Sequence, residues 1–380
     1  MDNLGDSLQY LAEIRLIDNH CHSVSGVVLS RPEFEDFLTE APSRRAAITS
    51  TFDSAAGLSL LAECSKVLGF DQTPEPDEYI SKRASFGAEE LMRLMFAGSG
   101  VDSLLVDGGY DSGSLIDNER LAKVSGARVF KVVRLEALAE QILASTRDAK
   151  TFPDDFRDAL VQATSDAVAL KSIAAYRFGL DLTERIPSRD EVVKAASEVV
   201  QQLTLNGTGR IQDRVLSSFL AYCAIESTRL PIQFHVGYGD PDLQLDRCNP
   251  SLLTPFIRQA LRAEVNVVLL HCYPYQREAA YLAHSFENVY FDLGLTMNFV
   301  GYNSSRILLE ALELAPFSKL LYSSDAFGVA ELHYLGALHF RRAVGEFLGL
   351  LSKEQLCSPQ YMKRLVSMFA RENARRAYSL

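Results

Sequence analysis

Short apolar runs recur along the whole chain, and most of them are followed by turn residues and then by a helical pattern. The runs predict strands at residues 15–22, 101–109, 127–136, 168–177, 231–238, 266–273, 289–295 and 320–327. They are nearly continuous and do not alternate between apolar and polar positions. Such runs are typical of parallel strands that are buried on both faces of a sheet.

Helical patterns separate nearly all of these runs. The clearest helices are predicted at residues 189–205, 213–227, 250–263, 276–285 and 304–314. Eight strands that alternate with helices predict an α/β protein with a (β/α)8 TIM-type barrel. A doubly wound open sheet is the alternative, but no G-x-G-x-x-G turn follows the first strand.

The segment between the first two strands is too long for a minimal barrel. Residues 52–68 and 88–96 carry apolar positions at helical spacing, with a break at TPEPDE, residues 73–78. We expect a helical insertion over about residues 30–97, above the mouth of the barrel where active sites lie. Residues 332–378 predict two or more further helices, and residues 1–380 are expected to form a single barrel domain.

Composition and charge limit the partners of the chain. Its 380 residues are 47% hydrophobic and 23% charged, and the formal net charge is −11. An acidic surface repels phosphate backbones, so we expect a small-molecule substrate and no nucleic acid. No basic amphipathic stretch, spanning segment or secretory signal is apparent, and six cysteines without short paired spacings indicate cytosolic thiols. These features predict a cytoplasmic protein without a membrane partner, and they leave a homo-oligomer open.

Five polar residues lie where the predicted strands end. His20 and His22 alternate within the first strand, so their side chains share one face. His235 and His271 lie at matching depth on the fifth and sixth strands, and Asp325 ends the eighth. Buried imidazoles need partners, and one metal ion satisfies several of them at once. The alternatives are hydrogen-bonded core histidines and, for Asp325, a helix N-cap.

Lys171 lies within the apolar run of the fourth strand, where a lysine must be paired, neutral or modified. Carboxylation by CO₂ would convert it into an anionic ligand that bridges two metals. The alternative is an ion pair with Glu136 or Asp107. Glu136 ends the predicted third strand facing the mouth of the barrel, and is either a further ligand or a surface carboxylate that opens a helix.

This order of residues resembles the ligand order of the amidohydrolase superfamily. The stretches LKSIAAYRFGL, LHCYPYQREAAYLA and LLYSSDAFGVAEL are most similar to the amidohydrolase-2 branch, and within it to the amidohydrolase-like domain of FluG-type and nodulin–glutamine synthetase proteins. The resemblance implies that His20, His22 and His235 bind metal and that Asp325 is a ligand or a base. His271 would be a ligand in a two-metal site, or would polarise substrate or orient water in a one-metal site.

The resemblance implies a metal-dependent amidohydrolase that cleaves an amide bond of a small carboxylate-bearing molecule, with γ-glutamyl amides as one such class. Nitrogen and oxygen ligands with an open position favour one or two zinc ions, and manganese or iron also fit. Asp325 would act as the general base towards a water activated by the metal. A mononuclear decarboxylase, which would lack a carboxylated Lys171, and a non-enzymatic protein with a relict site are the alternatives.

Four residues at or beyond the predicted strand ends are candidates for substrate binding. Arg177 could clamp a substrate carboxylate or form a structural ion pair. Tyr176 and Tyr273 lie beside the same mouth. His333 could line the mouth or pack within a helix.

Overall fold

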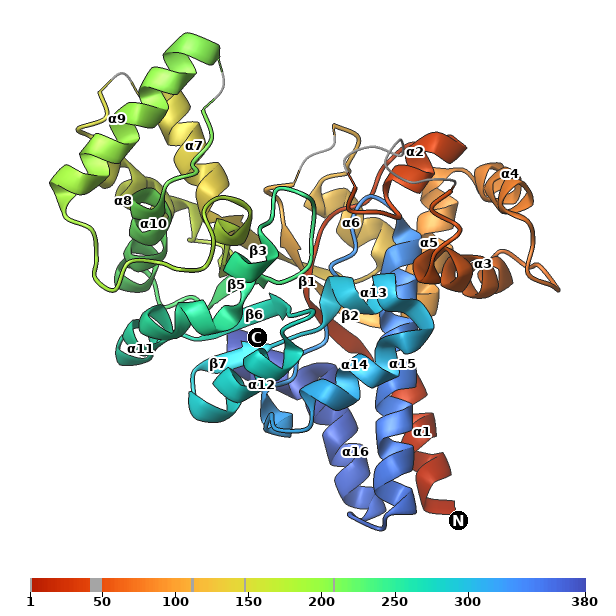
Figure 1. The fold of residues 1–380 in the computed structure, drawn as a ribbon. Helices are drawn as coiled ribbons and strands as arrows, with labels where there is room; N and C mark the ends of the chain where they lie inside the picture. Colours follow the sequence, from red (N-terminus) through yellow and green to blue (C-terminus); the bar gives the residue numbers. More distant parts are fainter. Residues whose placement is uncertain (1, 42–49, 111–112, 147, 208) are drawn as a thin grey trace. The chain divides into compact units, whose positions relative to one another are not determined.

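The computed structural model describes residues 2–41, 50–110, 113–146, 148–207 and 209–380 (Figure 1). The chain forms two compact units. The first consists of Met1–Val106, Tyr110–Phe130 and Asp292–Arg376, and the second of Asp107–Gly109, Lys131–Phe291 and Ala377–Leu380. The prediction of a single domain stays a prediction.

Seven parallel strands follow one another in sequential order in a sheet, and helices separate them (Figure 1). The strands are β1 (Leu16–Cys21), β2 (Val101–Asp107), β3 (Arg128–Arg134), β4 (Ala167–Ser172), β5 (Ile232–Val236), β6 (Val267–His271) and β7 (Val289–Phe291). Every residue of β1, β5, β6 and β7 is buried. The predicted TIM-type α/β fold is confirmed, and its buried strands are the near-continuous apolar runs of the sequence.

The prediction of an eighth strand is wrong, because residues 320–327 do not form a regular strand. Residues 320–327 lie beside β1, where the Asp325 amide donates to the His20 carbonyl at 3.0 Å and the His22 amide donates to the Ala326 carbonyl at 2.8 Å. Asp325 has a φ of 45°, so the backbone leaves the extended conformation there. A strand-like run therefore takes the place of the eighth strand without forming one.

Three other predicted strands end earlier than expected because helical turns begin in their last residues. Strand β3 is followed directly by α7 (Leu135–Ser145), β4 after one residue by η2 (Ala174–Tyr176), and β7 after two residues by α13 (Gly294–Val300). At the last of these, the Gly294 amide donates to the Asp292 carboxylate at 3.0 Å, which forms a turn just before the helix. Polar residues at the strand ends thus turn the chain.

The predicted helical insertion is present. Its described residues contain the helices α2 (Arg31–Asp36), α3 (Ala55–Val67), α4 (Pro76–Phe86) and α5 (Ala88–Ser99). Two of these helices, α2 and α4, are additional to the two that the pattern predicted. Helix α4 begins inside the TPEPDE stretch that was expected only to break the pattern. Pro76 is at the first helical position, and Glu78 accepts the Glu75 amide at 3.2 Å in a capping box.

The predicted C-terminal helices are confirmed as α15 (Ala330–Lys353), α16 (Pro359–Ser367) and α17 (Asn373–Tyr378). Within the first unit, α15 and α16 pack against α1 (Asp2–Glu13), and the three lie side by side in Figure 1. The remaining helices are α6 (Asn118–Ser125), α8 (Phe152–Ala163), α9 (Arg189–Asn206), α10 (Arg214–Ser227), α11 (Thr254–Arg262), α12 (Gln276–Ser285) and α14 (Ser304–Ala311). In the second unit, α7, α8, α9 and α10 form one helical cluster (Figure 1).

A buried ion pair joins the insertion to α15. Arg83 Nε of α4 lies 2.6 Å from Glu331 Oε1, and both side chains are almost fully buried. We expect Arg83→Met to lower the free energy of unfolding by about 3–5 kcal/mol, because the Glu331 carboxylate loses its cationic partner in the core and keeps the Tyr79 hydroxyl. Urea unfolding measures this change. The matched control is Arg306→Met, which removes an exposed pair with Glu310 and should cost less than about 1 kcal/mol. Equal costs for the two variants would contradict this role.

His339 on α15 predicts a pH-dependent stability. Burial and, secondarily, the Arg342 cation lower the pKa of His339 to about 4, and Glu63 opposes them. The unfolded chain then takes up a proton below about pH 6.5 that the folded chain refuses until about pH 4, so stability falls as the pH is lowered through this window. Between about pH 6.5 and pH 4, we expect the free energy of unfolding of the His339→Leu variant to fall by up to about 3 kcal/mol less than that of the parent, as measured by urea unfolding. Parallel pH profiles of variant and parent would contradict the assignment.

Candidate metal centre

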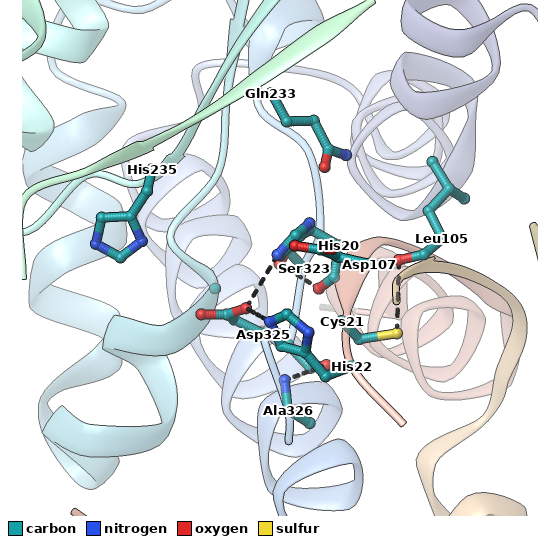
Figure 2. Close-up of polar contacts among 12 residues, drawn as sticks. His20, Cys21, His22, Leu105, Asp107, Gln233, His235, Ser323, Asp325 and Ala326 are labelled. Atoms are coloured by element: carbon teal, nitrogen blue, oxygen red, sulfur yellow. Dashed lines mark hydrogen bonds and ion pairs between the residues drawn. The ribbon is translucent and has the colours of Figure 1, made fainter. Parts of the chain in front are cut away.

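Three buried side chains of the first unit converge where β1 ends. His20 and His22 lie on one face because Cys21 between them points the other way, with its thiol 3.7 Å from the Leu105 carbonyl (Figure 2). Asp325 approaches them from the segment beside β1. The structure therefore brings together three of the residues that the sequence proposed as metal ligands.

The distances among these side chains fit metal ligands better than hydrogen bonds. The Nε2 atoms of His20 and His22 lie 3.3 Å and 3.5 Å from Asp325 Oδ1 (Figure 2). Charge-assisted N–H···O bonds are shorter, about 2.7–2.9 Å. Two donors bound tetrahedrally at about 2.0–2.1 Å from one ion lie about 3.3 Å apart. The three donor atoms all lie within 4.8 Å of one another, so the set fits one divalent metal.

Asp325 is held by its neighbours in a conformation that non-glycine residues rarely adopt. The preceding residue, Ser324, donates through its amide and hydroxyl to the two carboxylate oxygens of Asp18, at 2.9 Å and 2.5 Å. The same hydroxyl accepts the Ala326 amide at 3.0 Å. These bonds fix the backbone on both sides of the positive φ of Asp325, as expected for strain at a functional site.

Sequence reasoning missed Asp18 and its neighbour Asn19, which lie in β1 just before the histidines. Burial raises the pKa of Asp18 to about 8, although hydrogen bonds from Ser324 lower it. The Asn19 amide donates to the Asp292 carboxylate at 3.0 Å and to the Tyr322 carbonyl at 2.9 Å. Two polar residues between the apolar start of β1 and the histidines were the signal that could have identified this supporting network.

His333 is fully buried in α15, where its ring lies 4.7 Å from that of Phe96. Burial lowers its pKa to about 3, so it is neutral. Its Nδ1 lies 3.9 Å from Asp18 Oδ2, and these two residues and Cys21 form a second group of close donor atoms. A role of His333 in substrate binding stays a prediction.

In the second unit, His235 and His271 lie together on the adjacent strands β5 and β6, as predicted. Their ring centres are 4.7 Å apart, and Tyr176 lies 4.3 Å from His235. His235 Nε2 is 3.0 Å from the Tyr238 carbonyl. Because a carbonyl only accepts, this nitrogen carries the proton when His235 is neutral, and Nδ1 is left as the acceptor.

Backbone strain also occurs at the end of β6. His271 and Cys272 have φ values of 72° and 58°. A Cβ atom on Gly237, at the end of β5, would lie 2.0 Å from the Tyr273 carbonyl oxygen, so only glycine fits this close approach. Tyr273 itself is 36% exposed.

Lys171 is buried in β4, in register with Arg134 of β3 and Gln233 of β5. Each of the two carboxylates that the sequence offered as ion-pair partners accepts hydrogen bonds from another residue. Asp107 accepts two bonds from Arg134 at 2.6 Å and 2.9 Å. Glu136 is in the first turn of α7 and fully buried, so it is not a surface carboxylate, and it accepts the Ser172 hydroxyl at 2.7 Å. Burial raises the pKa of Glu136. Carboxylation of Lys171 stays a prediction.

Arg177, just after η2, lies 3.4 Å from the Glu140 carboxylate, and its side chain is only 10% exposed. This contact is a structural ion pair, one of the two roles that the sequence analysis considered for Arg177. Its use as a substrate clamp stays a prediction.

Residues 200–380 match the family model described as amidohydrolase. The predicted resemblance to the amidohydrolases is confirmed. Protein fluG of Emericella nidulans is 30% identical to the chain, over 89% of the chain and 42% of that protein. The chain thus spans less than half the length of this relative.

Solved structures agree with this assignment. A candidate metal-dependent hydrolase from Lactobacillus casei ATCC 334 is 28% identical, with a TM-score of 0.86 over 98% of this chain and 96% of that one. A uronate isomerase from Bacillus halodurans C-125, 15% identical with a TM-score of 0.66 over 99% of this chain and 96% of that one, shares the fold. The amidohydrolase match and the Lactobacillus casei structure support a metal-dependent hydrolase or a related enzyme with a divalent metal. Within the described residues, no helix combines the length and the apolar character needed to cross a membrane.

Proposed function

We propose that the chain is a metal-dependent amidohydrolase that cleaves the C–N bond of a small carboxylate-bearing amide, with γ-glutamyl amides as the first class to test. The observation that carries the proposal is the spacing of three buried side chains. The Nε2 atoms of His20 and His22 lie 3.3 Å and 3.5 Å from Asp325 Oδ1. Burial matters because electrostatic interactions there are strong and bulk water is excluded.

A bound divalent ion would supply Lewis acidity, which lowers the pKa of a water ligand towards about 7 and polarises a carbonyl. His20 and His22 would hold it through Nε2. Asp325 would accept the proton of the attacking water and deliver it to the leaving nitrogen. The backbone bonds around Asp325 would keep its carboxylate aimed at the reacting atoms without further reorganisation.

The sequence pattern extends the proposed ligand set to His235, His271 and Lys171, with zinc as the first metal to test and manganese or iron as alternatives. His271 would be a second ligand or would polarise the substrate. A carboxylated Lys171 would imply two ions. Metal content after single substitution of His235 and Lys171 tests each assignment separately. Arg177, Tyr176, Tyr273 and His333 are proposed substrate contacts.

The decisive assay incubates the metal-loaded chain with γ-glutamyl ethylamide and γ-glutamyl anilide. We expect glutamate and free amine in equal amounts, and no products after metal is removed with a chelator. A parallel incubation with 2-hydroxybenzoate measures CO₂ release. Release of CO₂ without amide cleavage would replace the proposal with the mononuclear decarboxylase. No product from any of the three compounds would contradict the proposed hydrolysis of this substrate class.

A further inference from the structure

We infer that Tyr110, Phe327 and Phe37 form an aromatic wall beside His22, and that this wall binds a flat apolar group, such as a phenyl ring, carried next to the bond that is cleaved. The inference deepens the proposed function and rests on it, because it takes His22 as a metal ligand. It names a substrate class, aryl-bearing amides, that the ligand set alone does not specify.

The three rings form a continuous row that starts at the metal centre. The Tyr110 ring lies 5.3 Å from the His22 ring, Phe327 lies 5.9 Å from Tyr110, and Phe37 lies 6.0 Å from Phe327. All of these separations are within the usual range of aromatic pairs. A group attached to an atom near His22 would therefore meet aromatic carbon first.

The row is assembled from three separate parts of the first unit. Tyr110 follows β2, Phe327 lies two residues beyond Asp325, and Phe37 is the C-cap residue of α2 in the insertion. All three residues are half-buried, whereas His20, His22 and Asp325 are buried. Partly accessible aromatic residues beside a buried polar cluster are the usual composition of a small-molecule site.

Phe327 is held in place by backbone hydrogen bonds of the residues on either side of it. The residue before it, Ala326, accepts the His22 amide at 2.8 Å, and the residue after it, Gly328, donates to the Ser23 carbonyl at 3.0 Å. Gly328 has a φ of 71°, and a Cβ atom there would lie 2.0 Å from the Phe37 ring. Glycine is therefore required for Phe37 to pack beside Phe327, and the wall is preorganised for a ligand.

The test measures binding of two hydroxamates to the metal-loaded chain by calorimetry. Benzohydroxamate and acetohydroxamate share the same metal-binding group and differ in a phenyl ring against a methyl group. We expect the Kd of benzohydroxamate to be at least about tenfold lower. Phe327→Ala and Tyr110→Ala should each reduce this ratio by at least about threefold, with little change for acetohydroxamate. Tyr302→Ala, which removes a ring that is 72% exposed, is the matched control.

Phe327→Leu and Tyr110→Leu cover the case in which an alanine variant does not fold, because leucine retains apolar bulk but removes the aromatic face. A ratio that stays at the parental value in all folded variants would overturn the wall. So would a parent chain that binds the two hydroxamates equally. Hydroxamate binding needs no turnover, so selectivity without amide cleavage would reject the proposed hydrolysis alone. Cleavage without ring selectivity would reject the wall alone.

Discussion

Replacing Asp325 by asparagine is expected to lower kcat by at least about 10²-fold and to leave the chain folded. The amide cannot accept the proton of the attacking water, and general-base catalysis alone contributes about 10²–10⁴-fold. Asparagine tolerates the positive φ of 45° at this position. Its neutral side-chain oxygen can still act as a metal ligand beside His20 and His22. The measurement is steady-state hydrolysis of the γ-glutamyl amide that the parent cleaves, together with circular dichroism and metal content.

The control for this variant is Asp246→Asn, the same chemical change at an exposed carboxylate of the second unit. It should keep the activity of the parent within about twofold, as expected for a surface substitution. An Asp325→Asn variant with more than about a tenth of the parental kcat would reject Asp325 as the base.

The double variant His20→Ala/His22→Ala is expected to lose the bound metal. Two of the three convergent donors disappear, so the ion loses both imidazoles of this cluster. We expect metal content to fall from about one equivalent or more to less than about 0.1 equivalent after gel filtration, and hydrolysis to fall with it. Elemental analysis of the same preparation measures both the loss and its recovery on adding zinc.

The matched control replaces His284, an exposed histidine on α12, by alanine. Its metal content should equal that of the parent. If the double variant retained the full content of metal, the ion would lie elsewhere and the site described here would be a hydrogen-bonded cluster.

The strands and most helices could be predicted because burial on both faces leaves a simple apolar record in the sequence. Helices leave a different record, a helical period of apolar positions. Helix α12 occupies the predicted residues 276–285 because its apolar positions follow that period. Residues 320–327 look like a strand by composition, but the Asp18 side chain takes the Ser324 amide that a ladder would use. Side-chain hydrogen bonds of this kind depend on tertiary partners, and no local pattern reveals them.

The candidate site was predictable only in part. His20, His22 and Asp325 were identifiable because each is a metal-binding residue type at the end of an apolar run. The support from Asp18 and the aromatic wall were not, because Tyr110, Phe327 and Phe37 come from three distant segments and meet only in the folded chain. Glu136 was expected to end the third strand, but α7 begins one residue before it, and its buried carboxylate accepts the Ser172 hydroxyl.

The most direct test of the metal centre is elemental analysis of the chain purified without added metal or chelator. The arrangement of His20, His22 and Asp325 predicts at least about one equivalent of zinc, manganese or iron per chain, and about two would support a carboxylated Lys171. Absence of metal, with no uptake when zinc, manganese or iron is added back, would contradict the account.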